Sequence, residues 1–354
     1  MNDDHLKELR DRIDALDDEI LRLLNDRAKI ALEIGELKQN GAIYRPEREA
    51  QVLRRLQELN RGPMPAAAVA RLFTEVMSAC RALEDSFSVA FLGPRGTFSE
   101  EAAIKHFGGS TGKVAAGSID EVFRKVEAGS SGYGVVPVEN STEGAVGRTL
   151  DLLLATPLRI CGEIMLPVHQ CLLAQRNAAV ARIYSHAQSL AQCHNWLEQN
   201  FPGVERVPVV SNAEAARLAS REGGTAAIAS GTAAELYGLD VLAANIEDDP
   251  NNTTRFLVIG SHDPAPSGRD KTSLVMSAAN RPGAVHALLS PLAQHGVSMT
   301  RLESRPSRTG LWEYVFFVDL EGHQQDAGVA QALEGLQALA AFVKVLGSYP
   351  VAVY

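Results

Sequence analysis

The first 37 residues of the chain carry a seven-residue apolar repeat that leaves few choices of fold. Two interleaved series run along this segment: Leu6, Ile13, Ile20, Arg27, Ile34 and Leu9, Leu16, Leu23, Ile30, Leu37. Apolar residues at this spacing form one stripe of a long helix that packs against a partner helix. We therefore expect a dimer that forms through residues 4 to 39.

Arg27 interrupts this stripe with a positive charge. A guanidinium in an apolar seam is costly unless an anion meets it. One interpretation is a carboxylate on the neighbouring helix, in which case Arg27 specifies the register of the oligomer. Lys38 favours another interpretation, because it follows eleven residues later on nearly the same face, roughly 16 Å along the helix. Two cations then face one groove, as an anionic ligand requires.

Arg10 borders the same seam but lies 28 residues before Lys38, roughly 42 Å along a straight helix. The two side chains cannot share a small ligand within one chain. If two copies of the helix run antiparallel, Arg10 of one copy approaches Arg27 and Lys38 of the other. The anion site would then be built from two subunits.

Two shorter helices are expected next. The first begins near Pro46, a residue suited to a first helical turn, and carries Arg48 and Glu49 at its start. The second begins near Pro65, and its apolar spacing puts Glu84 on the apolar face. Such an acid is often a helix-end carboxylate that reaches solvent. In a dry pocket, however, it would stay protonated and donate a hydrogen bond.

The runs LRDRIDALDDEILRLLNDRAKIALEIGELK, YRPERE and RLFTEVMSACRALE resemble the all-helical chorismate mutase domain over residues 1–86. The resemblance implies the catalytic residues Arg10, Arg27, Lys38, Arg48, Glu49 and Glu84. Where the family commonly has Asp or Ser, this chain has Arg45 and Cys80. The residue types fit the implied chemistry, because fixed cations suffice to fold chorismate and stabilise charge on its breaking ether bond.

Composition excludes several classes of function. The net charge of -9 argues against a general nucleic-acid binder. The four cysteines form no CxxC pair and the nine histidines no clustered ligand spacing, so we expect no metal, disulfide or cofactor. No apolar run approaches the length of a membrane span, and the N-terminus is charged. These features predict a cytoplasmic protein of two or three domains that does not bind membranes.

After residue 86 the pattern changes to short apolar strands separated by glycine and by helical stretches. We interpret residues 88–262 as two small α/β lobes, with a mostly parallel sheet and a cleft between the lobes. Ligands bind such sheets beyond the carboxyl ends of the strands, where this chain places hydroxyl and amide side chains. Any one of these blocks alone would be an ordinary turn or helix cap.

The blocks GPRGTFSE, VPVENS, YSHAQSLAQC and TTRF resemble prephenate dehydratase over residues 88–262. The resemblance implies that Thr254 assists departure of the ring hydroxyl and that Arg255 helps to bind a substrate carboxylate. The implied cleft residues are Thr97, Ser99, Glu139, Asn140, Ser141, Ser185 and Gln192.

A proline- and glycine-rich segment at residues 262–270 marks a second boundary. The pattern that follows, over residues 271–354, is βαββαβ, the ferredoxin-like order of an α+β domain. Its NRPGAVHALL and ESRP segments resemble the ACT regulatory domain. The resemblance implies an L-phenylalanine site made of Asn280, Gly283, Ala284, Val285, Glu303, Ser304 and Arg305.

Together these features predict a multidomain enzyme of L-phenylalanine biosynthesis, with an all-α, a two-lobed α/β and a ferredoxin-like α+β domain. It would convert chorismate to prephenate and then to phenylpyruvate, as a homodimer or larger homo-oligomer inhibited by L-phenylalanine. One alternative is a non-catalytic dimeric amino-acid sensor whose two lobes clamp a solute. Another is a protein in which one catalytic domain is inactive.

Overall fold

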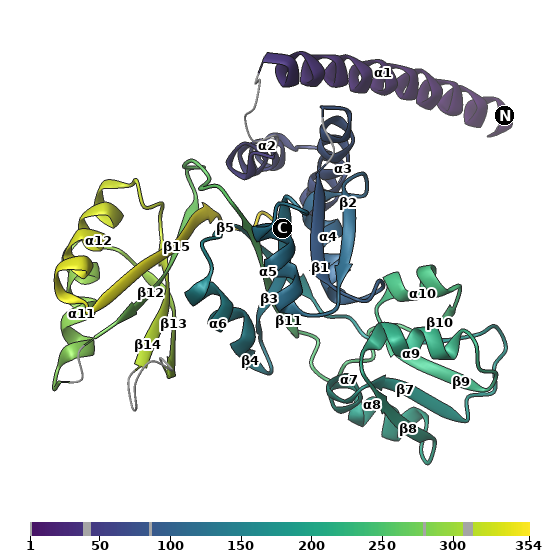
Figure 1. Ribbon diagram of the computed structural model, residues 1–354. Helices are drawn as coiled ribbons and strands as arrows, with labels where there is room; N and C mark the ends of the chain where they lie inside the picture. Colours follow the sequence, from purple (N-terminus) through teal and green to yellow (C-terminus); the bar gives the residue numbers. More distant parts are fainter. Residues whose placement is uncertain (1, 38–43, 85–86, 279–280, 307–313) are drawn as a thin grey trace.

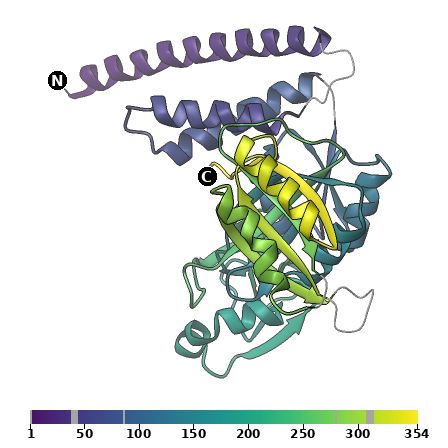
Figure 2. The same cartoon turned by 90° about the vertical axis from the view of Figure 1, so that its left-hand side faces the viewer.

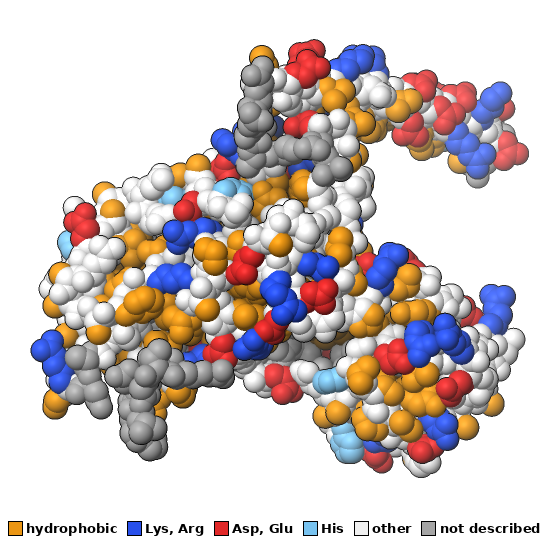
Figure 3. Space-filling model, in the orientation of Figure 1, with side chains coloured by type: hydrophobic (Ala, Val, Ile, Leu, Met, Phe, Trp, Pro, Cys, Tyr) orange, Lys and Arg blue, Asp and Glu red, His pale blue; other side chains and the backbone are white. Residues whose placement is uncertain are grey.

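The computed structural model describes residues 2–37, 44–84, 87–278, 281–306 and 314–354. Its first element is α1 (Asn2–Leu37), a continuous helix that extends as a rod away from the rest of the chain (Figure 1). The heptad stripe on α1 is exposed: Ile13, Leu16 and Ile20 keep 52 to 62% of their surface in solvent. Figure 3 shows apolar side chains gathered along one side of the rod. An apolar stripe of this length is the face of a helix that lacks its partner.

Two shorter helices lie beneath α1 (Figure 2). They are α2 (Pro46–Leu59) and α3 (Ala66–Glu84), which confirms the two helices expected near Pro46 and Pro65. Pro46 occupies the first turn of α2, where its missing N–H costs nothing. Leu53 of α2 packs on Ala70 and Met77 of α3, so these two helices share a small core of their own.

The first lobe of the α/β region is built on a mixed sheet in the order β2-β1-β3-β11-β5. Its elements are β1 (Ser88–Leu92), α4 (Phe98–Phe107), β2 (Gly112–Ala116), α5 (Ile119–Glu127), β3 (Tyr133–Asn140), β4 (Gly144–Ala145), α6 (Gly147–Ala155), β5 (Arg159–Pro167) and β11 (Thr253–Gly260). The prediction of a mostly parallel sheet is only partly correct. β1, β2 and β3 are parallel, but β11 returns from the second lobe and runs antiparallel between β3 and β5.

The second lobe has its own mixed sheet, in the order β10-β6-β9-β7-β8. Its elements are β6 (Cys171–Ala174), β7 (Arg182–His186), α7 (Ala187–Gln192), α8 (His194–Asn200), β8 (Glu205–Val209), α9 (Asn212–Ala219), β9 (Thr225–Ala229), α10 (Gly231–Tyr237) and β10 (Asp240–Ala243). The single helix expected around residues 191–199 is two helices that meet at Cys193, whose backbone leaves the helical region. Figure 1 shows this lobe set off from the rest of the molecule.

The last part of the chain confirms the ferredoxin-like order. It contains β12 (Asp270–Ser277), α11 (Ala284–Gln294), β13 (Met299–Pro306), β14 (Tyr314–Glu321), α12 (Ala327–Leu339) and β15 (Phe342–Pro350). The antiparallel sheet has the order β13-β14-β12-β15. Its two helices cover one face, while Val275, Phe317 and Leu346 on the other face join the core of the first lobe.

This sheet and the first lobe approach each other closely. At Gly347 of β15 a Cβ atom would collide with the backbone of Ile160 in β5, so only glycine allows the contact. The ferredoxin-like domain therefore rests directly on the sheet that contains β3 and β11. No helix of the described residues is long and apolar enough to cross a membrane.

Candidate functional sites

Arg27 lies against α3 rather than in open solvent. Its Nη1 donates a hydrogen bond to the Sγ of Cys80 at 2.9 Å, and Cys80 is buried. Arg27 is also close enough to Glu49 of α2 to act on the charge of that carboxylate. Arg27 of α1, Glu49 of α2 and Cys80 of α3 thus form one cluster. Cys80 stands at a position where the family commonly has another residue.

Glu84 sits where the end of α3 meets α1. A Cβ atom on Gly35 of α1 would lie 3.2 Å from the Cγ of Glu84, so the glycine gives the acid its space. The Oε2 of Glu84 is buried, and no described residue forms a hydrogen bond with it. A carboxyl oxygen without water or a donor is costly as an anion. That Glu84 acts as a protonated donor stays a prediction.

Glu49 is held by a residue that the sequence analysis did not select. Arg81 of α3, which is 5% exposed, donates to the Oε1 of Glu49 and to the carbonyl of Phe107 at 2.6 Å. Burial raises the pKa of Glu49 above its ordinary value, and the charges of Arg81 and Arg27 offset only part of the rise. Helical spacing was the available signal, because Arg81 follows buried Ala70 by eleven residues.

The remaining predicted residues of this site are not brought together within one chain. Arg10 and Arg48 are exposed, and Arg45 pairs with Glu47 through its Nε at 2.9 Å. Lys38 lies outside the described residues. One chain therefore supplies Arg27, Glu49 and Glu84 close to the contact of α1 with α3, whereas Arg10 lies about 25 Å away along the same helix.

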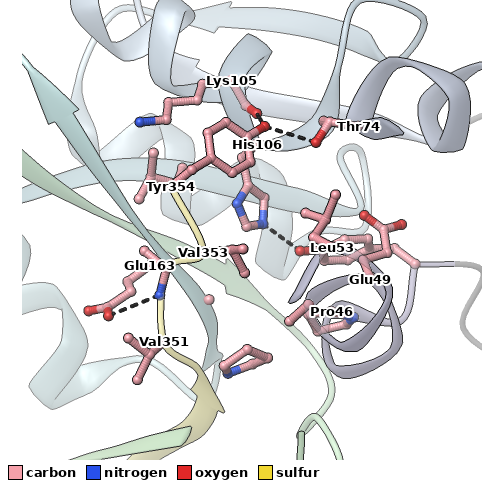
Figure 4. A pocket seen from close by; sticks show the side chains of 16 residues that line it. Pro46, Glu49, Leu53, Thr74, Lys105, His106, Glu163, Val351, Val353 and Tyr354 are labelled. Carbon is pink, nitrogen blue, oxygen red and sulfur yellow. Dashed lines mark hydrogen bonds between the residues drawn. The ribbon is translucent and has the colours of Figure 1, made fainter. Parts of the chain in front are cut away.

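A cavity of about 60 Å³ lies beside Glu49, where α2, α4, β5 and residues 350–354 meet (Figure 4). Leu53, Val353 and the ring of Tyr354 give it an apolar wall. His106 of α4 forms a hydrogen bond with the hydroxyl of Tyr44, and burial lowers the pKa of His106 to about 3. Sequence patterns do not predict this cavity, because its walls come from segments far apart in the chain.

A second cleft, of about 220 Å³, lies between the two lobes. Five of the residues predicted for the dehydratase site line it: Thr97, Ser99, Asn140, Gln192 and Thr254. The second lobe adds polar residues that the sequence analysis did not name: Gln170, His186, Gln188, Ser189, Ser211 and Asn212. Most of them directly follow a strand or begin a helix, which are the positions where the predicted polar blocks also lie.

Thr254 and Asn140 form the centre of the cleft's first-lobe wall. They are paired residues on β11 and β3, and the Nδ2 of Asn140 donates to the Oγ1 of Thr254 at 2.8 Å. The amide cannot be turned round, because its Oδ1 accepts from the backbone N–H groups of Thr142 and Glu143. Thr254 therefore accepts from Asn140, which leaves its own proton available for a ligand.

Ser185 and Ser141 support the cleft without lining it. Ser185 is fully buried, and its single hydroxyl proton lies between two acceptors, the carbonyl of Ile228 at 2.8 Å and the Oδ1 of Asn212 at 3.0 Å. The side chain of Asn212 does reach the cleft. The Oγ of Ser141 accepts from the backbone of Thr253 and thereby fastens the start of β11. The expectation that both line the cleft is wrong in this detail, since each orients a neighbour.

Arg255 and Glu139 lie on the opposite side of the sheet from the cleft that they were predicted to line. Side chains alternate along a strand, so the residues beside Thr254 and Asn140 point to the other face of the sheet. Arg255 is 8% exposed and bonds to Glu163, Asp319 and Tyr349, while Glu139 pairs with Arg301 at 2.8 Å. Neither residue lines the cleft, so the prediction that Arg255 binds a substrate carboxylate is wrong for this structure.

The cleft presents two helix N-termini instead of an arginine. None of the residues that the structure shows lining the cleft is Lys or Arg. The first turns of α4 and α9 enter the cleft from opposite lobes, after Thr97 and Ser211 as their N-caps. Free N–H groups and the positive end of the helix dipole attract carboxylates.

The predicted effector residues fall on two elements of the last domain. Gly283, with φ 78°, is the N-cap of α11, which Ala284 and Val285 begin. Glu303 and Ser304 lie on β13, and Asn280 lies outside the described residues. Arg305 instead reaches the first lobe, where its Nη2 contacts the Oδ1 of Asp151 at 3.2 Å. Its guanidinium also packs on Gly147, at which a Cβ would lie 2.6 Å away.

Comparison with known proteins covers each of these regions. Three family models match in succession: chorismate mutase type II over residues 9–85, prephenate dehydratase over residues 89–264 and the ACT domain over residues 272–337. A bifunctional chorismate mutase/prephenate dehydratase from Neisseria gonorrhoeae is 58% identical over 349 residues, which are 97% of this chain and 96% of that relative. All three regions thus have counterparts in one protein.

Solved structures resemble a smaller share of the chain. Prephenate dehydratase from Arthrobacter aurescens in complex with L-Phe has a TM-score of 0.69 at 34% identity, covering 74% of this chain and 89% of that one. GqqA, described as a quorum quenching acylase, has a TM-score of 0.70 at 31% identity, covering 75% of this chain and 98% of that one. Each of these two structures leaves about a quarter of the chain without a counterpart.

Proposed function

The chain belongs to the bifunctional chorismate mutase/prephenate dehydratase family, and we propose that its mutase site forms between two copies of α1. As a member of that family it is an enzyme of L-phenylalanine biosynthesis with two activities. It rearranges chorismate to prephenate, and it decarboxylates and dehydrates prephenate to phenylpyruvate. The observation that carries the assignment to this chain is the pairing of Thr254 with Asn140 in the inter-lobe cleft.

The exposed stripe of α1 supports the two-subunit mutase site. Its apolar residues have no partner among the described residues, and burying them on a second copy is favourable by about 25 cal/mol for each Å². An antiparallel second α1 brings Arg10 of the partner copy towards Arg27 and Lys38. These cations bind the two carboxylates of chorismate and hold its folded conformer. Glu84, when protonated, donates to the ether oxygen on which charge develops.

Mixing two inactive variants tests this arrangement. Arg10→Ala and Arg27→Ala each remove one half of every site, but a mixed dimer contains one site with both arginines intact. Random reassociation of equal amounts restores about a quarter of the sites, because the two sites of a dimer are related by symmetry. No recovery of mutase activity after mixing, with dimers present, would show that each chain builds its own site.

In the dehydratase site we propose that Thr254 donates a hydrogen bond to the departing ring hydroxyl. The bond to the carboxylate breaks, its electron pair enters the ring, and hydroxide leaves to become water with a proton from solvent. A threonine hydroxyl is a very weak acid, so it acts by a hydrogen bond that strengthens in the transition state. Asn140 fixes its direction, and the N-termini of α4 and α9 bind the carboxylates.

We propose that L-phenylalanine binds the last domain and inhibits the dehydratase. The L-Phe complex of the Arthrobacter aurescens enzyme supports this proposal. Gly283 opens the first turn of α11, whose free N–H groups suit a carboxylate, and Glu303 on β13 supplies an anion for the ammonium group. Calorimetry with L-phenylalanine tests it, and a chain that binds none would contradict it.

The oligomer and the compartment are proposed on simpler grounds. We propose a homodimer or larger homo-oligomer, because the mutase site needs a second α1. We also propose that the chain works in the cytoplasm, where its four free cysteines would stay reduced. Light scattering of the purified protein tests the first proposal, since a monomer at micromolar concentration would exclude it.

A further inference from the structure

Two neighbouring residue pairs on β3 and β11 face opposite sides of the first-lobe sheet. Thr254 pairs with Asn140, and Arg255 pairs with Glu139 one step along the ladder. Because side chains alternate along each strand, the first pair lines the cleft and the second faces the last domain. The wall of the active site and the inter-domain contact are thus two faces of the same four residues.

The guanidinium of Arg255 is fully engaged on the far face. Its Nε donates to Glu163 of β5 at 2.9 Å, its Nη1 to Asp319 of β14 at 2.5 Å, and its Nη2 to the Tyr349 hydroxyl of β15 at 2.9 Å. Glu163 also accepts from Lys271 at 2.8 Å. Three strands from two domains therefore meet at one side chain that is almost without solvent.

Asp319 depends on this arginine for its charge. Burial alone would raise the pKa of Asp319, but the charge of Arg255 and the hydrogen bond from Ser273 lower it below its ordinary value. The Oγ of Ser273 lies 2.5 Å from Asp319 and 2.6 Å from the hydroxyl of Tyr349. A buried anion with fixed partners cannot move without moving Arg255.

Glu139, which is only half-buried, forms an ion pair with a neighbouring strand of the last domain. Arg301 of β13 pairs with Glu139, and Arg301 is itself the ladder partner of Asp319. Two residues paired in the sheet of the last domain thus hold two residues paired in the sheet of the first lobe. Arg301 lies two residues before Glu303, on the strand that carries predicted effector positions.

We propose that Arg255 is a positioning residue that never touches prephenate. From the far face of β11 it fixes the Thr254–Asn140 pair, and through Asp319 it makes that geometry depend on the state of the last domain. The pairs Arg255–Asp319 and Glu139–Arg301 then form the element through which a bound effector changes dehydratase turnover. The second half of this proposal rests on the proposed inhibition by L-phenylalanine.

A merely structural clamp between domains is the alternative, and Lys344 provides the matched control. Its Nζ donates to the carbonyls of Leu153, Leu154 and Thr156 at 2.6 to 3.0 Å. It therefore joins the same two domains through a charged group, but it contacts neither β3 nor β11. Loss of this contact weakens the interface without reaching Thr254.

The experiment uses the full-length chain with Asp319→Asn, Arg255→Lys, the double variant and Lys344→Met. For each we measure dehydratase kcat and KM, L-phenylalanine binding by calorimetry, inhibition, and mutase activity as a folding control. We expect Asp319→Asn to lower dehydratase kcat about tenfold with little change in KM, and to bind L-phenylalanine while inhibition weakens at least about fivefold. The double variant should have a dehydratase kcat only slightly below that of Arg255→Lys, because both changes break the same Arg255–Asp319 ion pair.

Three results would overturn the proposal. Asp319→Asn could retain wild-type kcat and inhibition, Lys344→Met could reproduce its effects, or Arg255→Lys could raise KM alone, as expected of a residue that binds substrate. Should Asp319→Asn fail to fold, Tyr349→Phe removes one contact of Arg255 and is judged by the same measurements. If the wild-type chain does not bind L-phenylalanine, the proposed regulation fails, while the kcat comparison with Lys344→Met still decides the positioning role.

Discussion

Replacement of Thr254 by valine tests the centre of the dehydratase site. Valine keeps the β-branched shape that suits strand β11 and removes the hydroxyl alone. The change should do little to the fold, because the Nδ2 of Asn140 also donates to the Oδ1 of Asn252 at 2.9 Å and keeps that partner. What disappears is the proton that Thr254 offers to the cleft.

The expected loss follows from that single donor. A fixed donor aimed at developing charge in a site that excludes water is worth about 10²–10³ in kcat, or roughly 3–4 kcal/mol. We therefore expect Thr254→Val to lower dehydratase kcat by about that factor, with KM for prephenate changed only slightly. Mutase activity should be unaffected, because no residue placed in that site lies on β11.

The assay follows phenylpyruvate from prephenate and prephenate from chorismate in the same preparations. Thr254→Ser is the matched control, since it keeps the hydroxyl and should retain most of the turnover. Two results would refute the reasoning: a Thr254→Val enzyme within about threefold of wild-type kcat, or a serine variant as slow as the valine variant.

Other predictions concern the mutase region and its junction with the first lobe. Glu84→Gln keeps a hydrogen-bond donor at this position and Glu84→Ala removes it, so the glutamine variant should retain much more mutase kcat than the alanine variant; equal losses in the two variants would contradict this. The pKa of His106 falls from 6.5 to about 3. Between these two pKa values the unfolded chain binds more protons at this residue than the folded chain does. The free energy of unfolding is therefore not reduced by His106 above pH 6.5 and decreases below it, by about 2 kcal/mol from pH 7 to pH 5. Chemical denaturation should show His106→Gln losing much less over that range, and equal losses would exclude His106 as the cause. Arg81→Met leaves the Glu49 carboxylate buried without its partner and should destabilise the chain by about 3 kcal/mol; the double variant with Glu49→Gln should recover part of the loss in the same denaturation assay.

Local periodicity carried most of the prediction of the fold. The heptad stripe specified α1, and alternation with turn residues specified the βαββαβ domain, because both patterns depend on neighbouring residues only. The direction of β11 was beyond the reach of such patterns. That strand enters between β3 and β5 after the chain has crossed to the second lobe, and only the packing of the two lobes sets its antiparallel direction.

The residues of the candidate sites likewise fall into those that the sequence could predict and those that it could not. The polar blocks beside the strands were located by local pattern, because position beside a strand is a local property. The resemblance to prephenate dehydratase then implied Thr254, Asn140 and Gln192 within those blocks. Partners such as Arg81 and Gln170 were missed, since their roles depend on residues far along the chain. Whether Arg10 meets Arg27 depends on a second copy, so that expectation remains a prediction.

By itself, the sequence determined that Thr254 and Arg255 must face opposite sides of their strand, because the period of a strand is two residues. It did not determine which side lines the cleft between the lobes. The tertiary structure decided that by covering one face of the sheet with a second domain whose carboxylate, Asp319, needs a buried cation. The arginine therefore faces away from the cleft, whose described lining contains neither Lys nor Arg.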